Sequence, residues 1–170
     1  PNPGEGEPAG RVLFHPDGSL LGNVEARDLH QRQILRELRE GSLRGIPFQR
    51  EEVLRRIRQH FTDGKAAIAF GRLWQALVDE SRFPARGEIL EWIPLEKTRF
   101  TFPRPGGEEY SLLPEEVARS QAANLSVYLV KVSRLEYVLN HLDRNNAQGE
   151  EYLSDMIGIA AAEGWRVLPF

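Results

Sequence analysis

The alternation of apolar and polar residues near the N-terminal end of the chain predicts a β-hairpin. Val12 and Phe14 precede the sequence 16–18, Pro-Asp-Gly, and the apolar residues Leu20, Leu21 and Val24 follow it. Proline presets the backbone angle at the start of a turn, and glycine accepts a positive φ at its end. These residues therefore favour a tight reversal between two antiparallel strands.

Helical spacing dominates the middle of the chain, where apolar residues recur every three or four positions. The predicted helices are 28–40, 49–61, 66–80 and 114–120. Gly41 and Gly64 follow two of them, at positions where glycine commonly ends a helix. Two strands are expected between the third and fourth helices, at 87–95 and 98–102.

The last third of the chain has the most regular pattern. Residues 125–132, LSVYLVKV, form a predicted buried strand, and a helix is expected directly after it over 133–142. A second helix, from about 150 to 163, is predicted to end at Gly164, before a final strand at 165–170. Strand, helix, loop, helix and strand in this order indicate α/β architecture.

Composition and charge exclude several classes of protein. The chain has 170 residues, of which 41% are hydrophobic and 28% charged, as expected for one medium globular domain or for one domain with a large insertion. A net charge of −3, and no apolar run near the about 20 residues of a membrane helix, argue against nucleic-acid and membrane partners. The absence of cysteine excludes disulfides and thiolate metal sites and suits a cytoplasmic location.

The two ends of the sequence differ from the rest. Residues 1–9 are rich in proline, glycine and glutamate and are predicted to be a linker. The chain begins without an initiator methionine and ends on the apolar run 165–170. We therefore expect it to be a piece of a longer protein.

The most specific signal lies in the stretch RNNAQGEEYLSD. Residues 146–155 read N-A-Q-G-E-E-Y-L-S-D, which resembles the pattern N-A-Q-G-E-[YF]-Y-L-[TS]-D of sugar-1-phosphate nucleotidyltransferases. The likeness is closest to the catalytic domain of the bacterial N-acetylglucosamine-1-phosphate uridyltransferases.

Two further landmarks of that family occur upstream in the expected order. Gly10-Arg11, the hairpin and then V-E-A-R-D at 24–28 resemble the family's Y-G-R and V-E-x-K-D. The sequence N-L-S-V-Y at 124–128 resembles N-T-G-[IV]-Y. The resemblance therefore covers roughly residues 9–40 and 121–170.

This resemblance implies a fold and a division into domains. The fold would be the C-terminal portion of a Rossmann-like, mixed α/β nucleotidyltransferase sheet. Residues 10–40 and 121–170 would form the acceptor-sugar half of that domain. Residues 41–120 would be an inserted, mainly helical subdomain of unknown role, and a candidate surface for a protein partner or for homo-oligomer formation.

The resemblance also implies a reaction, in which a sugar 1-phosphate attacks the α-phosphate of a nucleoside triphosphate and pyrophosphate leaves. Such a reaction depends on positioning and on charge neutralisation, much of which Mg²⁺ supplies through hard oxygen ligands. By this likeness the sugar-binding residues would be Gly10, Glu25 and Asn124. Asn146 would be one ligand of the Mg²⁺, and its usual aspartate partner belongs to the N-terminal half of the family's domain. The residues that would support the site are Arg27, Asp28, Gln148 and Tyr152.

The chain departs from the family pattern at several positions. Ala9 replaces a tyrosine, Arg27 a lysine, and Glu151 an aromatic residue, and Leu125-Ser126 stands where the family has Thr-Gly. The family's glycine-rich triphosphate loop, L-x-x-G-x-G-T-R-M, does not occur in the 170 residues. We therefore expect this chain alone neither to bind nucleotide nor to turn over.

Each candidate residue also has a structural interpretation. Asn146, with its neighbour Asn145, is also typical of a loop and a helix N-cap. Asn124 is as typical of a side chain that satisfies nearby backbone groups, and Glu25 alone would be a solvated carboxylate at a strand end. The arginines of 50–58 alternate with glutamates, which favours a solvated helix face over an anion site.

Two hypotheses of function follow from different classes. In the first, the chain is part of an enzyme of cell-envelope biosynthesis that condenses a sugar 1-phosphate, with an N-acetylhexosamine 1-phosphate as the expected sugar, with UTP. In the second, it is a non-catalytic module for sensing sugar phosphates or for protein interaction, built on a degenerate nucleotidyltransferase scaffold. A glycine-rich loop and a metal-binding aspartate elsewhere in the protein would support the first.

Overall fold

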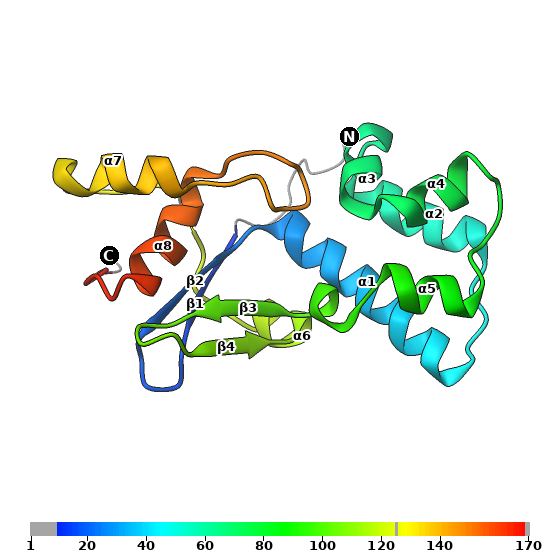
Figure 1. Ribbon diagram of the computed structural model, residues 1–170, viewed down its shortest axis with the longest axis horizontal. Helices are drawn as coiled ribbons and strands as arrows, with labels where there is room; N and C mark the ends of the chain where they lie inside the picture. The colour runs from blue at the N-terminus through cyan, green and yellow to red at the C-terminus, as the bar shows by residue number, and fades with distance from the viewer. Residues whose placement is uncertain (1–9, 125, 169–170) are drawn as a thin grey trace. The chain divides into compact units, whose positions relative to one another are not determined.

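The computed structural model describes residues 10–124 and 126–168, which are about half helical and contain small sheets (Figure 1). The chain divides into two compact units, each considered by itself. Residues 27–99 and 146–149 form the helical unit, and residues 10–26, 100–145 and 150–168 lie in the hairpin unit. The predicted linker at 1–9 lies outside the described residues.

The predicted β-hairpin is confirmed at the start of the hairpin unit. Strand β1 (Arg11–Phe14) pairs antiparallel with β2 (Leu20–Val24). In the turn, Asp17 accepts hydrogen bonds from the amide and hydroxyl of Ser19 at 2.8 and 2.6 Å, and from Arg104 at 2.8 Å. These donors, led by the Ser19 hydroxyl, hold the pKa of Asp17 well below its ordinary value.

A third segment runs along the other edge of β1. The amide of Val12 donates to the carbonyl of Ala122 at 2.9 Å, and the amide of Asn124 donates to the carbonyl of Gly10 at 2.9 Å. Between these bonds Arg11 and Ala123 form an isolated antiparallel bridge. Residues 122–124 are thereby attached to the start of the hairpin.

A second hairpin, β3 (Phe100–Pro103) with β4 (Glu109–Leu112), confirms the strand predicted at 98–102. Phe100 and Phe102 alternate with exposed residues and are both buried. A Cβ built on Gly22 of β2 would lie 3.2 Å from the Phe102 ring. Glycine at position 22 therefore lets this ring pack directly on the backbone of β2.

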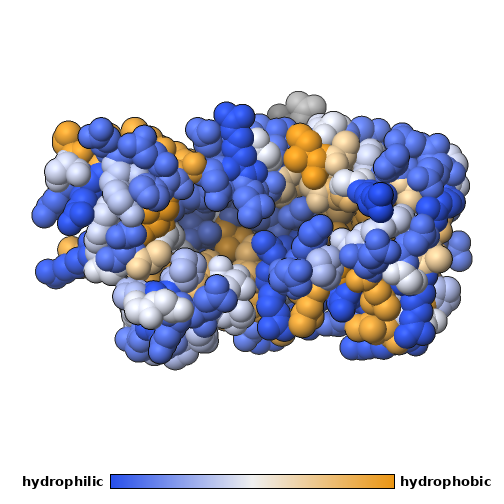
Figure 2. Space-filling view, in the orientation of Figure 1, coloured by the Kyte–Doolittle hydropathy of each residue, from blue (hydrophilic) through white to orange (hydrophobic). Residues whose placement is uncertain are grey.

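The rest of the hairpin unit is helical. It contains α6 (Pro114–Ala118), α7 (Val132–His141), the 3-10 turn η2 (Leu153–Asp155) and α8 (Met156–Ala162). Val138, Met156 and Ile157 are the buried residues of a small core between α7 and α8. Val132 and Leu139 of α7 are exposed, and Figure 2 shows hydrophobic surface among hydrophilic surface over this helix.

The first helix of the helical unit is longer than its sequence pattern predicts. Helix α1 (Ala26–Arg44) runs through Gly41, where we expected it to end. Gly41 is buried within the helix, and a Cβ built on it would lie 2.2 Å from the Phe48 ring. Glycine is thus used at position 41 for close packing, and Gly45, with φ +73°, has the left-handed conformation typical of a helix end.

Four more helices complete the helical unit: α2 (Arg50–His60), α3 (Asp63–Phe70), α4 (Arg72–Val78) and α5 (Arg86–Trp92). Their apolar faces surround one core with α1. Its buried members are Ile34, Leu35, Leu38, Val53, Leu54, Ile57, Phe61, Ala66, Phe70, Leu73, Trp74, Leu77, Ile89, Ile93 and Ala147. The helix predicted at 66–80 is two helices, because Gly71 interrupts it with φ +48°.

The strand predicted at 87–95 is wrong. Residues 86–92 form helix α5, followed by the 3-10 turn η1 (Leu95–Thr98). Ile89 and Ile93, four residues apart, are buried in the helical core. The Glu88 carboxylate accepts a hydrogen bond from the Ala85 amide at 2.8 Å and so stabilises the first turn of the helix.

The strands predicted at 125–132 and 165–170 are also wrong for the residues described. Residues 126–131 and 165–168 have no strand conformation with a paired neighbour. Tyr128 and Val130 pack against the small core of the hairpin unit, whereas Leu129 is 98% exposed. An apolar run is a buried strand only where a neighbouring strand pairs with it, and none of the described strands does.

The fold class is therefore confirmed only in its broad form. The structure is mixed α and β, with two antiparallel sheets of two strands each among the described residues. The Rossmann-like sheet stays a prediction. None of the helices in the described ranges is both long enough and apolar enough to cross a membrane.

Candidate functional site

The hairpin unit brings the three predicted sugar-binding residues together at the end of β2. Glu25 directly follows this strand. Its Oε1 accepts a hydrogen bond from Asn23 Nδ2 at 2.8 Å and another from the Ser154 hydroxyl at 2.6 Å. Both donors contact Oε1 and so hold the carboxylate in place.

Gly10 lies against this carboxylate. A Cβ built on Gly10 would lie 3.1 Å from both carboxylate oxygens of Glu25 and 3.0 Å from Asn23 Oδ1. These separations are tighter than ordinary van der Waals contact. The missing side chain at position 10 therefore makes room for the Glu25 carboxylate beside the backbone.

Asn124 is attached to Gly10 through its backbone and is itself buried, with 6% of its surface exposed. Its side-chain Oδ1 accepts hydrogen bonds from the Ser126 amide at 2.9 Å and the Tyr128 hydroxyl at 2.7 Å. The side-chain carbonyl of Asn124 thus satisfies nearby donors of the protein itself, as the structural interpretation of this residue expects. A ligand-binding role for Asn124 would have to use Nδ2.

The backbone beside Asn124 keeps a conformation that favours glycine. Ser126 has φ +56°, in the left-handed region that few residues other than glycine adopt without strain. The family resembled has glycine at this position. Serine at position 126 thus has a backbone conformation that glycine adopts more readily, and Leu125 lies outside the described residues.

We refer to Gly10, Asn23, Glu25, Asn124 and Ser154 as the Glu25 cluster. Its members come from the start of β1, the end of β2, the segment before residue 125 and the turn η2. Asn23 Oδ1 is buried and accepts no hydrogen bond from the described residues. A buried acceptor without a hydrogen bond costs about 1–3 kcal/mol.

The proposed metal ligand lies in the helical unit, in a tight turn at 146–149 that we call the Asn146 turn. Asn146 Oδ1 accepts a hydrogen bond from the Gln148 amide at 3.1 Å, and its carbonyl accepts one from the Gly149 amide at 3.2 Å. Gly149 has φ +65°, which suits glycine. The arrangement is the loop that the structural interpretation expected, and it leaves Asn146 half-buried.

The first residues of α1 hold the Asn146 turn. The Ala147 amide donates to Asp28 Oδ1 at 2.6 Å, and the Arg27 guanidinium donates to Gln148 Oε1. The predicted supporting residues Arg27, Asp28 and Gln148 are therefore brought together. Tyr152, the fourth, lies in the hairpin unit, where it directly precedes η2.

The chemistry of the Asn146 turn suits Mg²⁺ only in one respect. A carboxamide oxygen is a hard, neutral ligand, and Mg²⁺ commonly takes few protein ligands and the rest from phosphates and water. Among the described residues there is no group of three or more His, Asp or Glu side chains that could hold a metal ion by itself. Asn146 Oδ1 already accepts a hydrogen bond from the Gln148 amide, and its role as a Mg²⁺ ligand stays a prediction.

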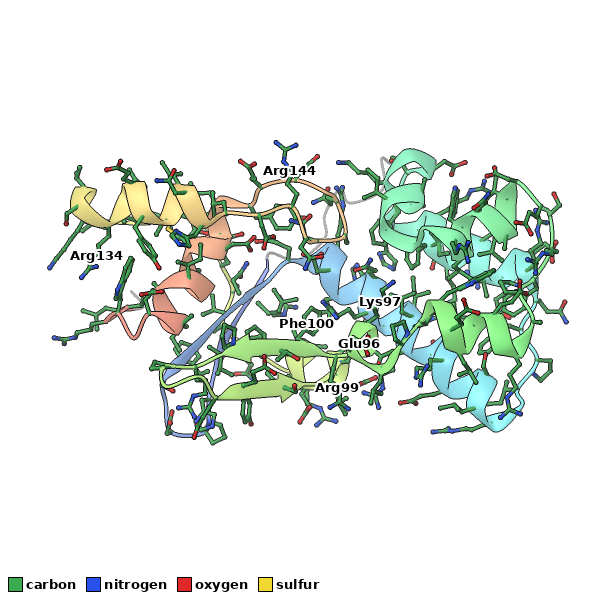
Figure 3. The ribbon with its side chains drawn as sticks, in the orientation of Figure 1. Glu96, Lys97, Arg99, Phe100, Arg134 and Arg144 are labelled. Carbon is green, nitrogen blue, oxygen red and sulfur yellow. The ribbon has the colours of Figure 1, made fainter. Side chains whose placement is uncertain are left out.

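The residue that departs from the motif, Glu151, is exposed and forms an ion pair with Arg144 across 3.2 Å. Figure 3 shows Arg144 pointing away from the loop between α7 and η2. Both side chains are more than half exposed, so this pair is worth little stability. Glu151 is therefore a solvent-facing residue of this loop.

Two arginines of α2 form ion pairs with carboxylates of the same unit. Arg56 forms a two-pronged ion pair with Glu37, and Arg58 contacts Asp63 through two bonds of 3.0 Å. The Arg58 side chain lowers the pKa of Asp63. These contacts favour the solvated helix face over an anion site.

Sequence reasoning missed Asn23, Ser154 and Lys65 as site residues. Asn23 of β2 stands two residues before Glu25, which directly follows the strand, and residues two apart in extended backbone share a face, so this spacing is a signal that could have found it. Ser154 is part of the recognised motif but received no role. Lys65 donates to the Gln148 carbonyl at 3.0 Å from 83 positions away, and no local pattern indicates that contact.

Curated relatives match parts of the chain. It is 35% identical over 106 residues to the bifunctional protein GlmU of Rhodococcus opacus, and this match covers 55% of this chain and 21% of that protein. It is 46% identical over 46 residues to GlmU of Neisseria gonorrhoeae, covering 27% of this chain and 10% of that protein. It is 36% identical over 59 residues to GlmU of Acinetobacter baylyi, covering 35% and 13%.

The chain thus spans about a fifth or less of the length of these relatives. No family model matches it, and no solved structure does. The partial matches support a relationship to sugar-phosphate nucleotidyltransferases.

Proposed function

We propose that the protein to which this chain belongs is a cytoplasmic sugar-1-phosphate nucleotidyltransferase of cell-envelope biosynthesis. Its substrates would be an N-acetylhexosamine 1-phosphate and UTP, and its products a nucleotide sugar and pyrophosphate. The chain would supply the part that recognises the acceptor sugar.

The observation that carries this proposal is the Glu25 cluster. A fixed carboxylate, a glycine that lets the backbone come close, and an asparagine side chain meet in one unit although they are far apart in sequence. A sugar presents hydroxyl groups and, in an N-acetylhexosamine, an amide N–H, all of which donate hydrogen bonds. Glu25 Oε2 would accept from such a group, and a bond to a charged acceptor is worth about 1.5–3 kcal/mol.

In the proposed reaction an oxygen of the sugar's phosphate attacks the α-phosphorus of UTP, and the bond to the β-phosphate breaks with release of pyrophosphate. The protein contributes by positioning the sugar phosphate, since little covalent chemistry is required of it. Mg²⁺ would neutralise phosphate charge when bound, with Asn146 as one of its ligands.

The second candidate function is a non-catalytic module that senses sugar phosphates. One observation favours it: Asn124 Oδ1 is already engaged by Ser126 and Tyr128, so the cluster offers less hydrogen-bonding capacity than its residue types suggest. Such a module would bind a sugar phosphate without consuming a nucleotide.

The test is pyrophosphate release by the full-length protein from UTP, with and without N-acetylglucosamine 1-phosphate and Mg²⁺. We expect release only when all three are present, and Asn146→Ala to lower kcat at least about tenfold. Asn145→Ala, at the exposed neighbouring amide, is the matched control and should leave kcat unchanged.

The outcomes separate the candidates. Binding of the sugar phosphate without pyrophosphate release would establish the sensing module instead of the enzyme. Release that is equal in Asn146→Ala and wild type would remove Asn146 from the metal site. If the protein neither binds the sugar phosphate nor releases pyrophosphate, both candidate functions are contradicted.

A further inference from the structure

We propose that the helices α1 to α5 are the scaffold of the Asn146 turn and that Lys65 of α3 is a positioning residue for Asn146. This inference rests on the proposed function for the metal role of Asn146. It gives the helical segment a task within the reaction, namely to hold one metal ligand in a fixed conformation.

The first support is the burial of Ala147. This residue directly follows Asn146, has no exposed surface, and is a member of the same hydrophobic core as Phe61, Phe70 and Trp74. That core is otherwise built entirely from residues of the helices and their connections. Because interiors are closely packed, the backbone at Ala147 cannot move without disturbing this core.

The second support is the contact of Lys65 with the turn. Its ammonium group donates to the Gln148 carbonyl at 3.0 Å, and Lys65 is half-buried. A hydrogen bond from a charged donor is stronger than one between neutral groups. It fixes the peptide between Gln148 and Gly149, whose amide in turn donates to the carbonyl of Asn146.

The third support is that α3 contacts the turn at a second point. A Cβ built on Gly149 would lie 3.3 Å from Cγ2 of Ile68. Lys65 and Ile68 are three residues apart on α3, so they lie on the same face of this helix. One face of α3 thus meets both ends of the Gln148-Gly149 peptide.

Two kinds of residues therefore hold the turn. Arg27 and Asp28 belong to the stretch that resembles the family's V-E-x-K-D, whereas Lys65 and Ile68 belong to the segment predicted to be inserted. The inserted helices add a second set of contacts to a turn that α1 already holds. Any change in the packing of α3 would reach the backbone of Asn146 through these contacts.

The test compares Lys65→Met, which keeps the aliphatic stem, with Lys65→Arg, which keeps a charged donor. Lys97→Ala is the matched control, because Lys97 is a lysine of the same unit whose ammonium donates to one backbone carbonyl, that of Trp92 at 3.4 Å (Figure 3). Backbone amide hydrogen exchange at Gln148 and Gly149, followed by NMR, is the first readout. The second is the Mg²⁺ concentration that gives half-maximal pyrophosphate release.

We expect Lys65→Met to speed exchange at these two amides about tenfold, which is the loss of one charge-assisted hydrogen bond. It should raise the Mg²⁺ requirement and leave KM for the sugar phosphate unchanged. Lys65→Arg and Lys97→Ala should behave like wild type in both readouts.

If the amides of Gln148 and Gly149 exchange at the same rate in Lys65→Met as in Lys97→Ala, the positioning role of Lys65 is overturned. Faster exchange with an unchanged Mg²⁺ requirement would show a structural contact without a role at Asn146, and would also overturn the inference. If the wild type releases no pyrophosphate, the proposed function has failed, and with it the metal role on which the inference rests. The exchange result alone then decides whether Lys65 holds the turn.

Discussion

Ser154 donates its hydroxyl to Glu25 Oε1 at 2.6 Å, across 129 positions of the chain. Ser154 belongs to the motif at 146–155, and Glu25 to the stretch at 24–28 that follows the hairpin. Two landmarks recognised separately in the sequence are thus joined by one hydrogen bond to a carboxylate. Ser154 is 9% exposed, so water has little access to replace this bond.

Ser154→Ala should destabilise the protein by about 1.5 kcal/mol, because it removes a hydrogen bond to a charged acceptor that is largely shielded from water. Urea unfolding at neutral pH measures this change. Ser154→Thr keeps the hydroxyl and is the matched control, with a change near zero. Equal destabilisation by the two variants would show that packing, and not the bond to Glu25, matters at this position.

Gly10→Ala should reduce sugar-phosphate binding more than stability. The new Cβ would lie 3.1 Å from the Glu25 carboxylate, which must turn away to make room. Overpacking of this kind costs about 1–3 kcal/mol. Calorimetric titration with N-acetylglucosamine 1-phosphate, beside urea unfolding, separates the two effects.

Gly87→Ala is the control for Gly10→Ala. A Cβ at Gly87, within α5, would meet no heavy atom within 4 Å, so the substitution should stabilise the helix by about 0.5–1 kcal/mol. Unchanged sugar binding in Gly10→Ala would contradict the role given to the close approach at Gly10.

Ser126→Gly should increase the free energy of unfolding by up to about 1 kcal/mol, because it relieves a left-handed backbone at φ +56°. The gain is limited because glycine also gains freedom in the unfolded chain. Ser81→Gly, at φ +52° in the helical unit, should show a similar gain. Only Ser126→Gly is expected to alter the affinity for the sugar phosphate, because the Ser126 amide contacts Asn124. Equal affinities in Ser126→Gly and the wild type would disprove an effect of Ser126 on binding through Asn124.

Acid should weaken the start of α5. Arg82, which forms bonds of 2.6 and 2.8 Å to the carboxylate, and the Ala85 amide lower the pKa of Glu88 from 4.5 to about 2. A carboxylate with a depressed pKa in the folded protein contributes stability that is present above pH 4.5 and is lost as the pH falls towards 2. The stability difference between wild type and Glu88→Gln should therefore shrink over this range.

The control for this titration is Glu91→Gln, which removes one negative charge from an exposed position of the same helix. Urea unfolding at a series of pH values measures the stability difference between each variant and the wild type. For Glu91→Gln this difference should not show the pH dependence expected for Glu88→Gln. A wild-type advantage over Glu88→Gln that grows as the pH falls below 4.5 would contradict the ion pair.

The sequence predicts well those elements whose signals are local. The turn at Pro16-Asp17-Gly18 and the helix α2 follow from short patterns, and both are confirmed. Gly41 was misinterpreted because a glycine can end a helix or admit a neighbouring side chain, and only the position of Phe48 distinguishes these uses. The segment 87–95 was misassigned because its apolar residues suit a short strand and a short helix equally well.

The apolar run at 125–132 shows a different limit. Its composition indicates a strand, but strand formation depends on a partner, and none of the described strands pairs with it. Among the candidate site residues, Gly10, Glu25 and Asn124 were found through their resemblance to the family motifs. Lys65 could not be found in this way, because its contact with Gln148 depends on how α3 packs in the folded unit.

The central claim is that Glu25 binds the acceptor sugar, and calorimetric titration of the full-length protein with N-acetylglucosamine 1-phosphate tests it most directly. Glu163→Gln is the control, because Glu163 is an exposed carboxylate of the hairpin unit that accepts a hydrogen bond from the Tyr137 hydroxyl at 2.7 Å. We predict binding by wild type and Glu163→Gln with equal affinity, and an affinity lower by at least about tenfold in Glu25→Gln. Equal affinities in all three proteins, or no binding by the wild type, would contradict the account.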